Sequence, residues 1–132
     1  AKEAENFAIA SAQRAVQLDP NNPQSYITLG GTYYQLGKWT EAQQQFQIAV
    51  SLKPDFANAH YNLGHALEQQ GKLNEALREY EAVKTLVGKD KAGSKKIGEE
   101  IERRKKGGES EMKASMDVMK KYRTELAELM QK

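Results

Sequence analysis

The apolar positions of this chain recur every three or four residues, the spacing that places side chains on one face of a helix. This pattern predicts helices over residues 23–36, 40–52, 57–70 and 73–87. In the first of these helices the apolar positions are Tyr26, Leu29, Tyr33 and Leu36. Gly37 follows directly, and glycine is the usual residue just past a helix C-terminus. The fold class predicted from this pattern is all-α.

The helices form pairs that repeat every 34 residues. A shift of 34 superposes identical or similar residues, with Leu29-Gly30 on Leu63-Gly64, Glu41-Ala42 on Glu75-Ala76 and Phe46 on Tyr80. Residues 1–19 align only with the second helix of the next copy, so the first copy lacks its first helix. The glycines and alanines let two helices approach closely, and the aromatic ring fills the space beside them. One pair cannot bury its own apolar face, so the pairs must stack.

These residues resemble the tetratricopeptide repeat family. The first complete copy carries the family pattern at Tyr26, Leu29, Gly30, Tyr33, Ala42, Phe46, Ala49 and Pro54. The second copy departs from it at three positions, with Leu67 for Tyr, Val83 for Ala and Gly88 for Pro. The resemblance implies a right-handed superhelix of antiparallel helix pairs with a concave groove. We expect a truncated repeat over 1–21 and complete repeats over 22–55 and 56–89.

Two unlike helices are expected after the repeats. Residues 90–106 keep the repeat frame at one Ile-Gly pair but are otherwise charged, as suits a polar helix that caps the stack. Residues 107–132 begin with two glycines, a flexible joint, and continue as an amphipathic helix over 109–131. The apolar stripe of this helix consists of Met112, Met116, Met119, Tyr122, Leu126, Leu129 and Met130.

The methionine-rich stripe is predicted to be a docking surface that is buried in the folded assembly. It lies two residues out of the repeat frame, about 200° around the helix, so this helix is not the second helix of a third repeat. Methionine adapts to irregular surfaces, which favours docking in a groove. The helix would dock within its own chain or be exchanged between two chains. An antiparallel coiled-coil dimer is the alternative.

The concave groove is expected to be lined by the first helices of the two complete repeats. Its predicted lining consists of amides, aromatic rings, small residues and one carboxylate: Gln24, Ile27, Thr28, Gly31, Tyr34, Gln35, Asn58, Tyr61, Asn62, His65, Glu68 and Gln69. Amides can bond a peptide backbone, and tyrosine adds apolar area with a polar tip. We expect Ile27, Tyr34 and Tyr61 to form an exposed cluster, which favours peptide binding over a merely solvated face.

One ligand mode of the family is not expected here. Co-chaperones of the family hold a C-terminal carboxylate with Lys and Asn on their first helices. The corresponding positions of this sequence carry Ile27, Gly31 and His65. Recognition of chaperone tails is therefore not predicted.

Catalysis, metals and cofactors are not expected either. The sequence shows no nucleophile–base pair, no phosphate-binding glycine loop and no carboxylate pair in an apolar setting. His60 and His65 are five residues apart and do not share a helix face, as an i, i+4 metal pair would. We expect His60 to pack in the repeat and His65 to face the groove. The absence of cysteine excludes disulfides and cysteine-based zinc sites.

The net charge of +2 over 132 residues is unevenly divided. Residues 1–88 hold seven Lys and Arg against nine Asp and Glu, and residues 89–132 hold thirteen against nine. The basic run 103–106 is flanked by glutamates and has no aromatic platform, so nucleic-acid binding is not expected. No segment approaches the ~20 apolar residues of a membrane span. The chain begins at Ala1 without a recognisable targeting segment, which leaves its compartment open, with the cytoplasm favoured.

The function predicted from these features is a non-catalytic scaffold that binds a peptide or helix in its concave groove. The expected partner is a protein or peptide, which includes the chain's own C-terminal helix or that of another copy. Two alternatives stay open. One is a self-assembly module that forms a homodimer, and the other is a regulatory arm of a larger enzyme or membrane protein.

Overall fold

The computed structural model describes residues 2–87, 99, 103 and 111–131. Six helices lie in these ranges: α1 (Lys2–Leu18), α2 (Pro23–Gln35), α3 (Trp39–Leu52), α4 (Ala57–Gln69), α5 (Leu73–Leu86) and α7 (Glu111–Met130). Their bounds lie within two residues of the predicted helices. The expected capping helix over 90–106 lies outside the described residues, except for Glu99 and Arg103, which are both exposed.

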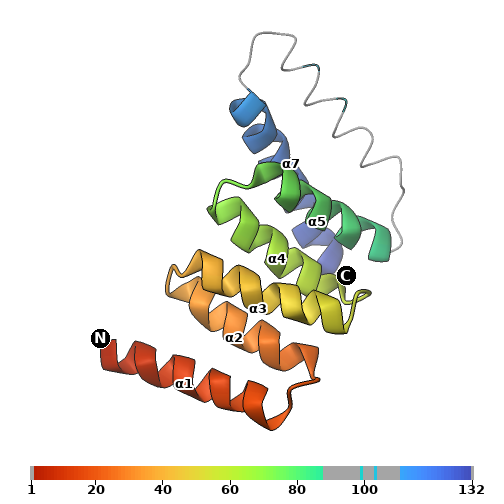
Figure 1. Ribbon diagram of the computed structural model, residues 1–132. Coiled ribbons are helices and arrows are strands. Elements are labelled where there is room, and N and C mark those ends of the chain that lie inside the picture. Colours follow the sequence, from red (N-terminus) through yellow and green to blue (C-terminus); the bar gives the residue numbers. More distant parts are fainter. Residues whose placement is uncertain (1, 88–98, 100–102, 104–110, 132) are drawn as a thin grey trace.

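The first five helices form a stack in which each packs on its neighbour in the sequence (Figure 1). Helices α2 and α3 form one antiparallel pair and α4 and α5 the next, while α1 packs against α2. Figure 1 shows α7 lying against α5 at the far end of the stack from α1. The fold is therefore all-α and built of antiparallel helix pairs, as the sequence predicts.

Each pair is held together by an aromatic ring that packs on a glycine. A Cβ atom built on Gly30 would lie 2.6 Å from Phe46 Cε1, and one on Gly64 would lie 2.5 Å from Tyr80 Cε1. Both distances are shorter than side chains tolerate, so only glycine fits beneath these rings. Ala42 is completely buried at the same crossing. The predicted role of the small residues is confirmed.

Local sequence signals fix the ends of the helices. Asn22 caps α2, since its side-chain oxygen accepts a hydrogen bond of 3.0 Å from the Gln24 backbone N–H. Pro23 occupies the first turn, where its missing N–H is not needed. Between the helices of each pair, Gly37 and Gly71 have φ angles of +75° and +77°, a conformation that favours glycine.

The loops between repeats are held by one recurring side-chain position. Tyr26 donates from its hydroxyl to the Pro20 carbonyl over 2.8 Å. One repeat later, His60 makes the equivalent bond from Nε2 to the Pro54 carbonyl, over 2.7 Å. The expected packing histidine thus also fastens the loop that precedes its helix.

Two acceptors face the ring nitrogens of His60 and favour its protonated form. Its Nδ1 lies 2.9 Å from Glu79 Oε1, while its Nε2 faces the Pro54 carbonyl. Neither oxygen can donate, so both ring nitrogens must carry protons to make both bonds. The hydrogen bond with Glu79 is the main cause that raises the pKa of His60, against the opposing effect of burial.

The direction of α7 differs from that expected for the first helix of a further repeat. Within a pair the helices are antiparallel (Figure 1): a short turn joins the end of α4 to the start of α5, and His60 near the start of α4 reaches Glu79, midway along α5. Helix α7 instead places Met116 beside Leu73 at the start of α5, and Tyr122 beside Tyr80 further along it. It therefore runs in the same direction as α5, whereas the first helix of a further repeat would run against α5.

Candidate functional site

A row of aromatic rings runs along α2, the start of α3 and α4. The Tyr34 ring lies 4.9 Å from the Trp39 ring and 6.2 Å from the His65 ring, both edge-on. The His65 ring stacks on Tyr61 at a centroid distance of 4.6 Å. Tyr61 in turn meets the edge of the buried Tyr80 ring at 5.8 Å. We call Trp39, Tyr34, His65 and Tyr61 the aromatic row, and all four are half-buried.

The aromatic row is uncharged at neutral pH. Burial lowers the pKa of His65, the opposite of the shift at His60. Burial also raises the pKa of Tyr61, which keeps its hydroxyl protonated. The row therefore offers ring faces and hydroxyl groups, not ions.

Helices α2 and α4, which carry three rings of the aromatic row, also carry exposed amides, and one of these, Gln69, donates to the Tyr34 hydroxyl. Gln24, Gln35, Asn58 and Gln69, four of the predicted groove residues, are all exposed. Two other predicted residues use side-chain donors within their own helices. Asn62 donates to the Asn58 carbonyl over 2.9 Å, and Thr28 donates to the Gln24 carbonyl over 3.0 Å.

Gly31 of α2 has open space beside it. A Cβ atom there would meet nothing within 4 Å. This glycine differs from its neighbour Gly30, which lies beneath the Phe46 ring.

Ile27 is not part of the exposed surface. Only 7% of it is accessible, and it belongs to the hydrophobic core. The expectation that it would form an exposed cluster with Tyr34 and Tyr61 is wrong. Helix α2 packs against α1, α3 and α4, so its solvent-facing strip is narrower than a single helical face suggests.

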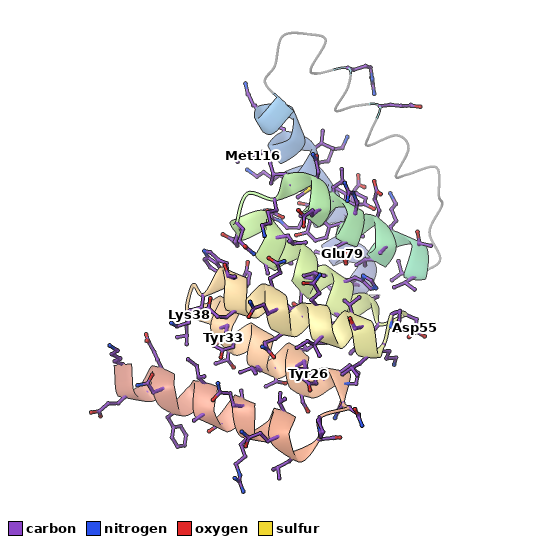
Figure 2. The ribbon with its side chains drawn as sticks, in the orientation of Figure 1. Tyr26, Tyr33, Lys38, Asp55, Glu79 and Met116 are labelled. Atoms are coloured by element: carbon purple, nitrogen blue, oxygen red, sulfur yellow. The ribbon has the colours of Figure 1, made fainter. Side chains whose placement is uncertain are left out.

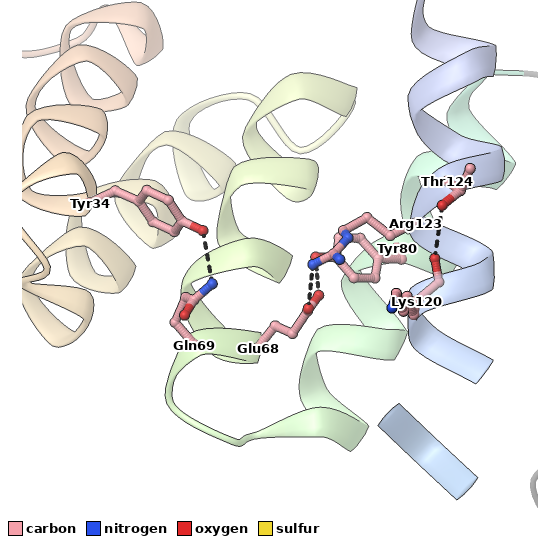
Figure 3. A network of polar contacts seen from close by, with 7 residues as sticks. All are labelled: Tyr34, Glu68, Gln69, Tyr80, Lys120, Arg123 and Thr124. Atoms are coloured by element: carbon pink, nitrogen blue, oxygen red, sulfur yellow. Dashed lines mark hydrogen bonds and ion pairs between the residues drawn. The ribbon is translucent and has the colours of Figure 1, made fainter. Parts of the chain in front are cut away.

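Glu68, the one predicted carboxylate, is engaged by two partners. Tyr80 donates its hydroxyl hydrogen to Oε1 over 2.8 Å, and Arg123 of α7 donates to Oε2 over 2.6 Å (Figure 3). Burial and the Glu68 carboxylate raise the pKa of Tyr80, so the phenol remains a donor. Sequence reasoning placed Glu68 in the groove but did not foresee Arg123, because their contact spans 55 residues of chain.

Helix α7 buries one stripe against the repeats. Met119, Tyr122 and Leu126 are at most 2% exposed and join the core cluster of the stack. The Tyr122 hydroxyl donates to the Tyr80 carbonyl over 3.2 Å. Lys84 places its ammonium group 5.0 Å from the centre of the Tyr122 ring.

The buried stripe of α7 differs at its edges from the predicted one. Met116, near the amino-terminal end of the helix, is 55% exposed (Figure 2), so the expectation of its burial is wrong. Val118, absent from the predicted stripe, is only 2% exposed. The two residues lie about 200° apart on the helix, so burying Val118 turns Met116 outward. Met130 is half-buried, and the side chains of Met112 and Leu129 lie outside the described residues.

Metal binding and membrane insertion find no support in the described part of the chain. Among these residues no three His, Cys, Asp or Glu side chains are grouped to hold an ion. None of the described helices is both long and apolar enough to cross a bilayer.

The repeat region matches three family models. A tetratricopeptide repeat model matches residues 11–44, a TPR repeat model matches 30–71, and a second tetratricopeptide repeat model matches 57–89. None of these models describes a catalytic family. Among curated protein sequences, no relative matches the chain.

Several solved structures are similar to this chain. The first TPR domain of Spaghetti (RPAP3), bound to an HSP90 peptide, is 28% identical, with a TM-score of 0.60 over 64% of this chain and 68% of that one. The Yersinia enterocolitica type III secretion translocator chaperone SycD is 16% identical, with a TM-score of 0.63 over 80% and 77%. A MamA protein is 22% identical, with a TM-score of 0.60, and this chain spans 61% of its length.

The family matches, the helix pairs and the glycine–aromatic crossings agree with one another. Repeats of this kind typically serve as protein–protein interaction modules and are generally non-catalytic. This chain belongs to the tetratricopeptide repeat family.

Proposed function

We propose that the concave face binds a peptide or helix of a protein partner, without catalysis. The observation that carries the proposal is the aromatic row of Trp39, Tyr34, His65 and Tyr61. Half-buried rings lose little conformational freedom when a ligand covers them, and aromatic side chains dominate binding energy at many protein interfaces. The RPAP3 domain, a structural neighbour, is bound to a peptide, which supports the same class of ligand here.

The chemistry of this face favours an uncharged stretch of the partner. The aromatic row carries no ion, and Glu68 is already paired with Arg123. The exposed amides of Gln24, Gln35 and Asn58 can bond main-chain groups of any sequence. Apolar side chains of the partner would lie on the rings while its backbone meets the amides.

Helix α7 would limit the groove at one end. It contacts Glu68 at the end of α4 and leaves the aromatic row half-exposed. A partner would therefore lie along α2 and α4 and reach α7 at the turn between α4 and α5. In this proposal, α7 forms one end of the binding surface.

The proposal can be tested with peptides selected against the folded chain from a random display library. Affinity of a selected peptide would be measured by fluorescence polarisation. Loss of an aromatic anchor typically costs about 2 kcal/mol or more, so Tyr34→Ala should weaken binding at least tenfold. Lys53→Ala is the control, because Lys53 is exposed on the loop after α3 and should stay within about twofold of the parent affinity.

Two results would count against the proposal. One is normal binding by Tyr34→Ala while its thermal unfolding is unchanged. The other is failure of the library to yield any peptide whose binding depends on the aromatic row.

Self-assembly through α7 is a separate candidate. The contacts of Met119, Tyr122 and Leu126 close within one chain, but the same contacts could form with α7 of a second copy. Light scattering after size exclusion tests this candidate, because a dimer formed through α7 should become a monomer when residues 107–132 are deleted, whereas α7 docked within its own chain gives a monomer from the start.

A further inference from the structure

A cavity of about 360 Å³ opens between α7 and the turn that joins α4 to α5. Leu73, Met116 and Met119 supply its apolar lining. Met116 remains 55% exposed, whereas Met119 is almost completely buried. The volume lies near the lower end of ligand pockets, which run from about 300 to 1,000 Å³, so it suits a large side chain better than a whole helix.

The charged groups that line this cavity differ in whether they are paired. Glu68 and Arg123 are joined by a 2.6 Å ion pair, and their charges offset each other. Lys120 also lines the cavity, is exposed, and has no ion-pair partner within the described part of the chain. The mouth therefore keeps one positive charge beside an apolar lining.

Gln69 joins the cavity to the aromatic row. Gln69 lines the cavity and donates from Nε2 to the Tyr34 hydroxyl over 3.2 Å (Figure 3). A peptide that covers Tyr34 would thus pass Gln69 before it reaches Lys120. The cavity lies at the α7 end of the concave face.

We propose that this cavity binds a large aliphatic side chain of a peptide partner together with an acidic side chain next to it. The aliphatic group enters between Leu73, Met116 and Met119, and the carboxylate meets the Lys120 ammonium group. The inference rests on the proposed function, because it assigns the chemistry of one end of the same partner. Thioether side chains adapt to different aliphatic shapes, so the site selects by charge more than by exact form.

The four methionines of the chain provide the readout, since all of them lie at or after residue 112. In the full chain labelled with ¹³C at methionine methyl groups, we would titrate the blocked dipeptide N-acetyl-Leu-Glu-amide. The methyl signals of Met116 and Met119 should shift together. Met130 lies near the other end of α7 and should not shift.

Charge selectivity tests the role of Lys120. The matched probe N-acetyl-Leu-Lys-amide should bind roughly fivefold more weakly, about the effect of one exposed charge pair. Lys120→Glu should abolish or reverse this preference. Lys121→Glu is the control variant, because Lys121 is an exposed neighbour on α7 that does not line the cavity, and it should keep the preference.

The inference is overturned if the acidic dipeptide moves no methionine signal up to about 10 mM, the range expected for so small a ligand. It is also overturned if the two probes bind equally. Tyr34→Ala separates this inference from the proposed function, because it should weaken the long selected peptide but not the dipeptide. If a long peptide needs Tyr34 for binding and still leaves the methyl signals of Met116 and Met119 unshifted, that result contradicts the inference about the cavity but not the proposed function.

Discussion

Adjacent glycines of α2 have opposite roles. Gly30 lies beneath the Phe46 ring, where a Cβ atom would come within 2.6 Å of Cε1, while Gly31 faces open space. Both residues are inside the same helix, so their intrinsic helix propensities are equal. Any difference between alanine substitutions at these two positions must come from packing.

We therefore expect Gly30→Ala to lower the free energy of unfolding by about 1–3 kcal/mol through overpacking. Gly31→Ala should leave it unchanged or raise it by about 0.5–1 kcal/mol, since alanine favours the helix. Chemical denaturation of the two variants measures the difference. Equal effects would contradict the glycine–aromatic crossing.

The two histidines are expected to affect stability in opposite ways as pH changes. The folded pKa of His60 is raised above its ordinary value of 6.5, so its contribution is complete below pH 6.5 and is lost as pH rises through the folded pKa. The folded pKa of His65 is lowered, so stability is lost as pH falls below 6.5 toward that lower pKa.

Thermal unfolding at about pH 5.5 and pH 8 tests this expectation. His60→Gln should lower the Tm more at the lower pH, because that variant loses the imidazolium bonds to Glu79 and Pro54. His65→Gln should lower the Tm more at the higher pH. The same pH trend in both variants would show that the bonds of His60 are not those of a charged ring.

At the scale of elements, α7 is attached to the stack by a stripe that its sequence only partly reveals. It runs in the direction of α5 and meets the carboxylate of Glu68 through Arg123. The heptad spacing of methionine and leucine identifies an amphipathic helix. It does not say which edge of the stripe faces the protein, because that depends on the shape of α5.

Two methionines of α7 test which edge of the stripe faces the stack. Met119 is 1% exposed and Met116 is 55% exposed. Met119→Ala should lower the free energy of unfolding by about 2–3 kcal/mol, while Met116→Ala should change it by less than about 0.5 kcal/mol. If both substitutions cost the same, α7 is rotated differently from the arrangement described here.

At the scale of the whole molecule, the two ends of the stack differ in how far their apolar side chains are covered. The α5 end is covered by α7, whereas α1 packs against α2 and leaves Phe7 75% and Leu18 73% exposed. Large exposed apolar residues grouped on one surface favour association with another protein.

We expect the α1 surface to promote self-association at high protein concentration. Phe7→Glu should shift the chain toward monomer, because a buried unpaired carboxylate opposes association. The control Ile48→Glu changes an exposed apolar residue of α3 and should have little effect. Sedimentation velocity across a concentration series measures both, and a strictly monomeric parent chain would contradict the expectation.

The sequence by itself determined the helices and their pairing. Local signals such as Asn22 before Pro23, and Gly37 after a periodic apolar run, act within a few residues. The 34-residue period also identifies which helices form a pair. Gly30 packs under Phe46 in one copy for the same reason that Gly64 packs under Tyr80 in the next. These features are short-range or repeated, and so they can be read from the chain alone.

Only the tertiary structure decided the exposure of Ile27, the rotation of α7 and the partner of Glu68. Ile27 is buried because three helices surround α2, and Val118 replaces Met116 in the interface because of how α7 lies on α5. The Glu68–Arg123 pair joins residues 55 positions apart that no repeat relates. Contacts of this kind depend on how whole elements pack, which no periodicity in the sequence records.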